Sequence, residues 1–274
     1  MLKLNRNLAT LVFPARCLGC QDELSPDQSN SIEQNDSGQA NDFEFNSELT
    51  AGQFDFASSL DTHWCVDCWR KLNDHSSRCH KCAAIVFANN PLNDRCPLCR
   101  NLDLRFESTV SVGNYRGLLQ ELVIEMKNRH NEQLAVQLGR LLGFHVYNCD
   151  FRDDLDLVIP IPTHWWRRIK RGFHGTDILA QSLADSCGLD HSNRVLKCLR
   201  STKKQGTLST AGRFRNVRSA FAVEATELIS GKTILLIDDV MTSGATTSEA
   251  ARILLREGAS KVFVGVVARG ARVS

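Results

Sequence analysis

Two adjacent carboxylates, Asp238 and Asp239, follow a strongly apolar run in the segment ILLIDDVMTSGAT, residues 234–246. The apolar run has no polar alternation, which is typical of a parallel strand that is covered on both faces. The pair is therefore predicted to lie at the carboxyl end of a strand, where open α/β sheets bind ligands. Carboxylates in that place can accept hydrogen bonds from the hydroxyl groups of a sugar.

A loop of small and hydroxyl-bearing residues follows the acidic pair, and a helix is expected to begin near Ala245. The N–H groups at the start of a helix, together with nearby hydroxyls, form a nest for a phosphate group. The loop lacks the GK[ST] ending of a P-loop, which argues against an ATPase. The segment thus predicts a site for a phosphorylated sugar; the alternative is a strand and turn capped by Asp and Thr for local reasons alone. The loop residues are Thr242, Ser243, Gly244, Ala245, Thr246 and Thr247.

Cysteine spacing provides the second chemical signal. Eight of the eleven cysteines form four CxxC pairs before residue 100, and two residues between thiolates let both sulfurs point at one metal ion. Two such knuckles complete a tetrahedral Zn²⁺ site, so we expect two structural zinc ions. Sequential pairing of the knuckles and interleaved pairing both fit the spacing. The pairs are Cys17/Cys20, Cys65/Cys68, Cys79/Cys82 and Cys96/Cys99.

A disulfide framework is the rival interpretation of these cysteines. The N-terminal sequence MLKLNRNLATLVFP lacks the apolar core and the small-residue cleavage site of a secretory signal, so we expect a reducing, cytoplasmic location, which favours metal. No apolar run approaches the ~20 residues of a membrane span, and none is expected. Eight thiolates complete two sites without an open coordination position, so the zinc is expected to hold structure rather than perform chemistry.

The charge of the chain is divided unevenly. The formal net charge is +2, but residues 21–62 contain ten acidic residues and no Lys or Arg, which leaves 33 basic and 21 acidic residues elsewhere, or +12. The acidic segment is rich in Ser, Asn, Gln and Asp and is expected to be a disordered insertion. It is either a tolerated loop or a tail that competes with anionic ligands for the basic surface. A basic surface suits phosphate-rich partners, single-stranded DNA among them.

Strand and helix patterns alternate after the cysteines. A helical stripe runs over residues 117–147 with a break near 128–131, and LDLVIPIP, residues 155–162, reads as a buried strand. A basic turn, residues 167–175, precedes another helix, and residues 200–218 look like a mobile basic loop. Further strands are expected at residues 220–223 and 261–267. The chain therefore predicts a Cys-rich module over residues 1–105, with the insertion 21–62, and an α/β domain over residues 106–274.

Several segments together resemble the ComF/GntX family, the competence protein F group of phosphoribosyltransferase-like proteins. They are the knuckles, the segment from Tyr115 to Lys127, VIPIP, the RGF turn, the stretch KKQGTLSTAGRFRNVRSAF and the loop IDDVMTSGAT. The resemblance covers nearly the whole chain except the acidic insertion. It implies a type I phosphoribosyltransferase-like parallel sheet with helices on both faces, preceded by a small Cys-rich zinc module.

The resemblance also implies a ligand, phosphoribosyl pyrophosphate (PRPP), and roles for single residues. Asp238 and Asp239 would bind the ribose hydroxyls or the Mg²⁺ of PRPP, and the loop Thr242, Ser243, Gly244, Ala245 and Thr246 its 5-phosphate. Lys127 would face the pyrophosphate, with Arg167 and Arg171 nearby. The chain departs from the family at the basic turn, where His174 and Gly175 stand in place of Asn and Gln. The later stretch QxxLSxxxRxxN is kept by Gln205, Leu208, Ser209, Arg213 and Asn216.

Two classes of function follow from these observations. The first is a Mg²⁺-dependent phosphoribosyltransferase of unknown acceptor, in which Asp238, Asp239 and Lys127 act by positioning and electrostatics as pyrophosphate leaves an oxocarbenium-like ribosyl centre. The second is a binding protein that keeps the PRPP site as a sensor and works with single-stranded DNA or the competence machinery during DNA uptake. Release of pyrophosphate from PRPP discriminates between them.

Overall fold

The computed structural model describes residues 15–24, 63–73, 76–86, 95–129, 131–162, 174–202 and 208–270. The chain forms two compact units, Met1–Asn73 and Asp74–Ser274. The acidic insertion, expected over residues 21–62, lies outside the described residues except for residues 21–24. The boundary expected between residues 105 and 106, which separates the Cys-rich module from the α/β domain, stays a prediction.

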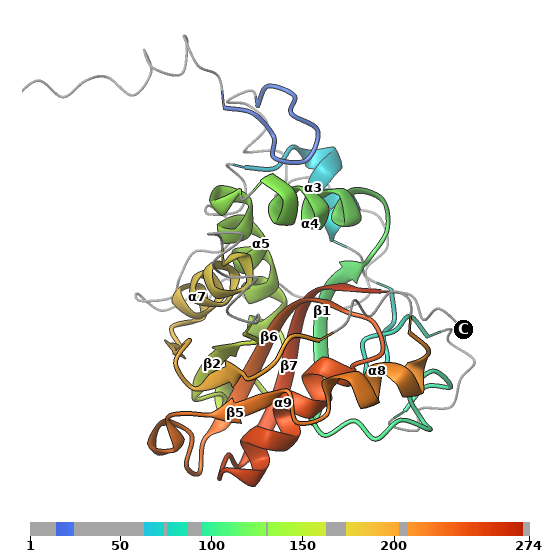
Figure 1. The fold of residues 1–274 in the computed structure, drawn as a ribbon. Helices are drawn as coiled ribbons and strands as arrows, with labels where there is room; N and C mark the ends of the chain where they lie inside the picture. The colour runs from blue at the N-terminus through green and yellow to red at the C-terminus, as the bar shows by residue number, and fades with distance from the viewer. Residues whose placement is uncertain are drawn as a thin grey trace, which may run out of the picture. The chain divides into compact units, whose positions relative to one another are not determined.

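The larger unit is built on a five-stranded sheet in the order β1-β7-β6-β2-β3, and every neighbouring pair in it is parallel (Figure 1). The central strand β6 is buried from Thr233 to Ile237, as its unbroken apolar sequence predicts. The expected parallel α/β fold is therefore confirmed. The strands are β1 (Thr109–Asn114), β2 (Leu157–Pro160), β3 (Asp190–His191), β6 (Thr233–Met241) and β7 (Lys261–Arg269).

Helices cover both faces of this sheet (Figure 1). On one face, α9 (Ala245–Arg256) packs through Ala250, Ile253 and Leu254 against inward residues of β6 and β7 such as Leu236 and Val264. On the other face lie α5 (Glu132–Tyr147) and α7 (Gly175–Cys187). Adjacent residues of a strand point to opposite faces, so β6 is buried on both of its faces up to Ile237.

The predicted break in the long helical stripe is confirmed. Helix α4 (Gly117–Arg129) ends and α5 begins at Glu132, because the side chain of Asn131 caps α5 by accepting a hydrogen bond from the N–H of Leu134 at 3.0 Å. Within the described residues, no helix combines the length and the apolar character that crossing a membrane requires.

Helices α5 and α7 approach closely at Gly139. A Cβ atom at this position would lie 2.5 Å from the carbonyl oxygen of Leu179 and 2.9 Å from Cβ of Ser182. The hydroxyl of Ser182 also donates to the carbonyl oxygen of Val136 at 2.8 Å. A backbone atom cannot rotate aside as a side chain can, so glycine is needed here for packing.

Gly139→Ala is therefore expected to lower the free energy of unfolding by about 1–3 kcal/mol, the usual range for overpacking. Helix propensity alone would give the opposite sign, a gain of up to about 1 kcal/mol. Urea denaturation measures the difference. Gly212→Ala serves as the control, because the nearest atom to its Cβ would be the Ser209 hydroxyl at 3.2 Å rather than a backbone atom; a larger loss at Gly212 than at Gly139 would contradict the packing argument.

A small two-stranded antiparallel sheet, β4 (Leu196–Cys198) with β5 (Phe221–Val223), stands apart from the main sheet. Between them, residues 210–217 form helix α8 (Thr210–Val217), so the expectation of a mobile loop over residues 200–218 is wrong for this part. Ser209 caps α8 by accepting from the N–H of Gly212, and the buried Arg213 donates to the carbonyl oxygen of Leu208 at 3.0 Å. These local hydrogen bonds stabilise a helix that composition alone does not indicate. The larger unit also contains two short 3₁₀ helices, η2 (Arg152–Asp154) and η4 (Thr226–Leu228).

Candidate functional site

The carboxyl ends of β2 and β6 form a topological switch point. The chain leaves β2 through α7 toward β3 on one side, whereas it leaves β6 through α9 toward β7 on the other side. The two strands are paired up to Pro160 and Ile237. Because the connections diverge here onto opposite faces, a crevice opens at these strand ends, which is where ligands bind in open α/β sheets. Asp238 is the residue that follows the last pair.

The acidic pair and Lys127 come together at this switch point. Lys127 lies near the end of α4, and its Nζ is 2.8 Å from Oδ1 of Asp239. Oδ1 of Asp238 accepts a hydrogen bond from the N–H of Asp239 at 2.9 Å. The side chains of Lys127 and Asp239 are 35% and 18% exposed, so the pair is partly open to ligands.

Burial and mutual repulsion alter the titration of this group. Burial raises the pKa of Asp238 to about 7, and the charge of Asp239 adds to the rise, while Lys127 opposes it. Burial by itself lowers the pKa of Lys127, but Asp239 and then Asp238 outweigh it, so the net shift of this pKa is upward. Lys127 therefore stays a cation beside Asp239, and a bound cation or hydrogen-bond donor would stabilise the charged form of Asp238.

The predicted phosphate loop leads directly into α9. Gly244 adopts φ 77° and ψ 7°, the left-handed region, and caps the helix at Ala245. The N–H of Ala245 donates to Oγ of Ser243 at 3.4 Å. The first-turn N–H groups of a helix have no acceptors within the helix, which makes this end an anion-binding element. Thr242 and Thr246 are half-buried, whereas Ser243, Gly244 and Ala245 are buried.

Thr247 has the most deeply buried hydroxyl among the loop residues named from the sequence. It is 1% exposed, and its hydroxyl donates to the carbonyl oxygen of Gly244 at 3.0 Å. This hydroxyl therefore stabilises the turn and does not face a ligand, contrary to the expectation. Arg167 and Arg171, the expected partners of pyrophosphate, lie outside the described residues.

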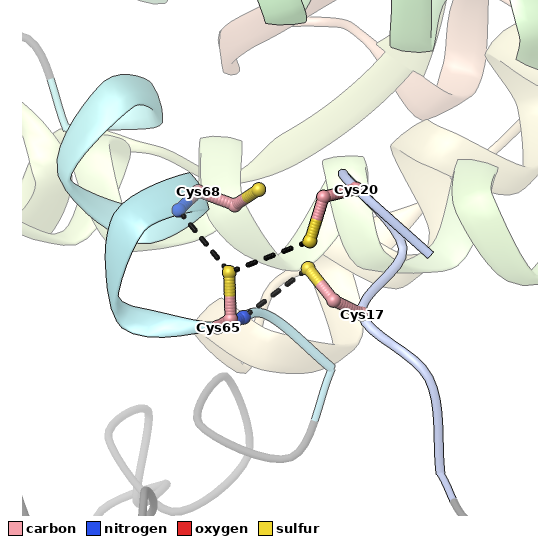
Figure 2. A group of neighbouring side chains, drawn as sticks. All are labelled: Cys17, Cys20, Cys65 and Cys68. Carbon is pink, nitrogen blue, oxygen red and sulfur yellow. Dashed lines mark hydrogen bonds between the residues drawn. The ribbon is translucent and has the colours of Figure 1, made fainter. Parts of the chain in front are cut away.

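The first candidate metal centre belongs to the smaller unit. Figure 2 shows Cys17, Cys20, Cys65 and Cys68 with their sulfurs directed toward one another. The sulfurs of Cys20 and Cys65 are 3.7 Å apart, and the N–H of Cys65 donates to the sulfur of Cys17 at 3.2 Å. Cys65 also caps α3 (Val66–Leu72) by accepting from the N–H of Cys68.

The second candidate metal centre lies in the larger unit and consists of Cys79, Cys82, Cys96 and Cys99, all buried. The sulfurs of Cys82 and Cys96 are 3.6 Å apart, and those of Cys79 and Cys99 are 3.8 Å apart. Of the two pairings that the spacing left open, the structure shows the sequential one. Its cysteines are part of the hydrophobic core that α9 and the sheet share, so this knuckle pair is not separate from the α/β fold.

Both clusters fit a tetrahedral zinc ion. Four sulfurs at ~2.3 Å from one Zn²⁺ are about 3.8 Å from each other, whereas a disulfide brings two sulfurs to about 2.05 Å. In each cluster the four sulfurs lie within 4.8 Å of one another. Each cluster therefore offers Zn²⁺ four sulfur ligands at the separation that a tetrahedral site requires.

Burial and mutual contacts alter the pKa values of the clustered thiols. The hydrogen bond from Cys82 lowers the pKa of Cys79 to about 4, whereas the same contact and burial raise the pKa of Cys82. Burial likewise raises the pKa of Cys99 to about 12. In the first cluster burial raises the pKa of Cys20 to about 11. One thiolate forms readily and repels the next, and a divalent cation removes that repulsion.

A shared backbone detail of the two knuckles was not visible in the sequence. Gln21 and Ala83, each directly after the second cysteine of its knuckle, have φ of 67° and 54°. Their N–H groups donate to the carbonyl oxygens of Cys17 and Cys79. Glycine is the usual residue for this conformation, so neither side chain signals the turn.

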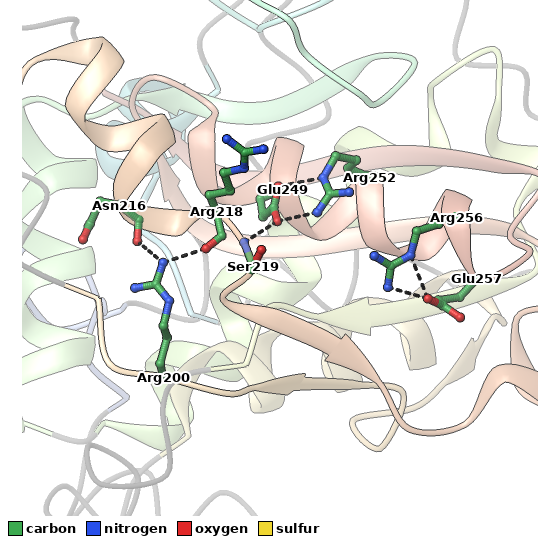
Figure 3. A network of polar contacts seen from close by, with 8 residues as sticks. All are labelled: Arg200, Asn216, Arg218, Ser219, Glu249, Arg252, Arg256 and Glu257. Carbon is green, nitrogen blue, oxygen red and sulfur yellow. Dashed lines mark hydrogen bonds and ion pairs between the residues drawn. The ribbon is translucent and has the colours of Figure 1, made fainter.

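Much of the positive charge around α8 and α9 already has partners (Figure 3). Arg200 donates to the carbonyl oxygens of Asn216 and Arg218 at 2.9 and 2.7 Å. Arg252 pairs with Glu249, whose Oε1 also accepts from the N–H of Ser219 at 2.7 Å. These contacts join α8 to α9, so part of the basic residues counted in the sequence stabilise the fold.

The chain is similar in sequence to known proteins. A model of the phosphoribosyl transferase domain matches residues 170–272, which include the acidic pair and the phosphate loop. The DNA utilization protein YhgH of Salmonella typhi is 32% identical over 213 residues, covering 76% of this chain and 92% of that protein. Its counterpart from Escherichia coli strain K12 is 29% identical over 213 residues, covering 76% and 91%. Competence protein F of Haemophilus influenzae is 27% identical over 178 residues, covering 64% and 78%.

Proposed function

The chain belongs to the ComF/GntX family, and we propose that it binds PRPP with Mg²⁺ at the carboxyl end of β6. The grouping of Asp238, Asp239 and Lys127 at the switch point, beside the start of α9, is the observation that supports this most. A PRPP site needs hydrogen-bond acceptors for the ribose, a nest for the 5-phosphate and a cation for the pyrophosphate. These elements occur here on three different segments of the chain.

Each segment has a proposed role. Asp238 and Asp239 accept hydrogen bonds from the ribose hydroxyls or hold Mg²⁺, and the loop from Thr242 to Thr246 receives the 5-phosphate at the start of α9. Lys127 faces the pyrophosphate, with Arg167 and Arg171 from the segment after β2. The Lys127–Asp239 ion pair keeps the ammonium group beside the sugar site, so it is positioned before the anion arrives.

Transfer from this site requires little covalent chemistry from the protein. Mg²⁺, when bound, neutralises the pyrophosphate and so improves it as a leaving group. Lys127 and the loop hold the two ends of the ligand, and the carboxylates stabilise the positive charge that develops on the ribose ring.

A second candidate is a PRPP-sensing accessory protein that handles single-stranded DNA during uptake. The names of the relatives, DNA utilization protein and competence protein F, favour it. The formal charge of +12 outside residues 21–62 also suits a polyanionic partner. We place either function in the cytoplasm, where the eight clustered thiols remain reduced and available to metal.

Calorimetric titration with PRPP in the presence of Mg²⁺ tests the site, and ribose 5-phosphate and pyrophosphate as separate ligands test its two halves. We expect PRPP to bind more tightly than either half. Release of pyrophosphate on addition of purine and pyrimidine bases, amines or oligonucleotides identifies a transferase. Binding without release identifies the accessory protein, and a protein that binds none of the three ligands refutes the proposed site.

A further inference from the structure

A single buried side chain joins the second cysteine cluster to the phosphate loop. Arg269, at the end of β7, is 5% exposed. Its Nε donates to the carbonyl oxygen of Cys82 at 2.6 Å, and its Nη1 donates to that of Met241 at 3.0 Å. Nη1 also donates to the carbonyl oxygens of Thr242 and Gly270. The guanidinium group thus bridges the backbone of a metal ligand and the backbone at the start of the loop.

A second link runs from the other knuckle of the same cluster. The hydroxyl of Ser248, in the first turns of α9, donates to the carbonyl oxygen of Asp103 at 2.9 Å and accepts from the N–H of Arg105 at 3.1 Å. Leu104 lies against the loop itself, because a Cβ on Gly244 would come within 3.1 Å of its Cδ2. The chain that leaves Cys99 therefore packs against the turn that opens α9.

The knuckle at Cys79 and Cys82 is also fixed to the sheet. The N–H of Thr109, the first residue of β1, donates to the carbonyl oxygen of His80 at 3.0 Å, and its hydroxyl donates to that of Lys81 at 2.9 Å. The Cys79/Cys82 knuckle is therefore bonded to β1 and, through Arg269, to the start of the phosphate loop, while the segment after Cys99 is bonded to α9 through Ser248. A change in the cluster cannot leave these elements undisturbed.

Charge reinforces this connection. A Zn²⁺ ion with four thiolates has a net charge of about −2, and a buried negative cluster is stabilised by a nearby cation. Arg269 is that cation for Cys82. When metal holds the four thiolates together, the guanidinium group is attracted to the cluster and kept in the position from which it bonds the carbonyl oxygens of Met241 and Thr242.

We propose that Arg269, assisted by Ser248, is a positioning residue that couples metal occupancy of the Cys79/Cys82/Cys96/Cys99 site to the conformation of residues 241–248. The loop has its ligand-binding conformation only when this site is metal-loaded. The consequence for PRPP rests on the proposed function, whereas the coupling between metal and loop does not. By linkage, a ligand that orders the loop must also tighten the metal site.

The test compares Arg269→Met with Arg256→Met, an arginine on α9 that is exposed and pairs with the neighbouring Glu257. Hydrogen exchange of residues 241–248 is followed by mass spectrometry, and thermal melting confirms that each variant is folded. We expect exchange in these residues to be at least 10-fold faster in Arg269→Met and within twofold of the native rate in Arg256→Met. PRPP affinity is expected to fall at least 10-fold in the first variant only.

Reciprocity supplies a readout that general destabilisation would not produce. Alkylation of the four cysteines of the second site, mapped by mass spectrometry, is measured with and without PRPP. We expect PRPP to slow alkylation in the native protein but not in Arg269→Met. An alkylation rate that responds equally to PRPP in both proteins overturns the role of Arg269.

Ser248→Ala covers the case in which Arg269→Met does not fold, because it removes only one hydroxyl. Exchange of residues 241–248 is expected to be about 3–10-fold faster in it, in line with the loss of one or two hydrogen bonds. If residues 241–248 exchange hydrogen at the native rate in Ser248→Ala and in folded Arg269→Met, the proposed coupling is wrong. If the native protein binds no PRPP, the proposed function fails while exchange with and without metal at the second site still decides the coupling.

Discussion

Asp238→Asn combined with Asp239→Asn is expected to weaken binding of PRPP with Mg²⁺ by at least about 100-fold. The substitutions keep the shape of both side chains and remove their charge, so hydrogen bonds to the ribose and attraction to Mg²⁺ are lost together. A charge-assisted hydrogen bond contributes ~1.5–3 kcal/mol, and ~1.4 kcal/mol corresponds to a factor of ten in affinity. Isothermal titration calorimetry measures the change.

The matched control is Asp153→Asn combined with Asp154→Asn. These carboxylates are also adjacent, but they lie in η2, before the amino end of β2, and their side chains are 92% and 59% exposed. Affinity for PRPP is expected to stay within twofold of the native value in this control. An unchanged affinity in the Asp238 and Asp239 variant would show that the ligand binds elsewhere or does not use the acidic pair.

The variant with Asp238→Asn and Asp239→Asn is also expected to change the pH dependence of stability. Burial and the neighbouring Asp239 raise the pKa of Asp238 from its ordinary value of 3.8 to about 7 in the folded protein. Between these pH values the folded state binds a proton that the unfolded state has released, so stability falls as pH rises from about 4 to 7. Asparagine does not titrate, and the melting temperature of the variant relative to the native protein is expected to increase over this range. The variant therefore loses ligand affinity without losing its fold.

The elements around the acidic pair were predictable because their signals are local. An unbroken apolar run defines β6, the hydroxyl-rich turn defines the start of α9, and the polar break near Asn131 separates α4 from α5. Strands β3 and β4 have two and three residues, too few for a periodic pattern. Helix α8 was missed because its capping by Ser209 and the burial of Arg213 depend on contacts that composition does not reveal.

Spatial relations between distant segments were the least predictable part of the site. The resemblance assigned Lys127 to the pyrophosphate but did not predict its contact with Asp239, since no spacing rule connects a residue near the end of α4 with β6. The hydrogen bonds from Arg269 to Cys82 and Met241 had no signal, because an arginine at the end of an apolar strand reads as a solvated charge. The pairing of the CxxC knuckles likewise needed the structure, since two pairings satisfied the same spacing.

The purified chain is expected to contain two zinc ions. Loss of either ion is expected to destabilise the fold more than the other substitutions do. Structural Zn²⁺ contributes ~10–16 kcal/mol of apparent binding free energy in small metal modules, and ligation energy is folding energy there. Cys68→Ser and Cys82→Ser each remove one ligand from a different cluster. Elemental analysis is expected to find about one zinc ion per chain in each variant.

The two variants should differ in what they unfold. Cys68 belongs to the smaller unit, so its loss is expected to unfold the described part of that unit, residues 15–24 and 63–73, and to speed proteolysis there. Cys82 lies in the core that Leu236, Val264 and Leu254 share, so its loss is expected to lower the melting temperature of the α/β unit as well. The second cluster is buried in the core that it shares with the sheet, so its metal is expected to stabilise the α/β unit too.

Cys198→Ser is the control for cysteine substitution, because Cys198 lies in β4 outside both clusters, and its thiol donates to the carbonyl oxygen of Arg200 at 3.3 Å. Two zinc ions should remain in this variant. Two zinc ions in Cys82→Ser would contradict four-cysteine ligation at the second site. A melting temperature of the α/β unit that falls equally in Cys68→Ser and Cys82→Ser would show that the first cluster also supports this unit. If the metal at the second site is part of the core that supports the phosphate loop, the melting temperature of the α/β unit falls in Cys82→Ser and not in Cys68→Ser.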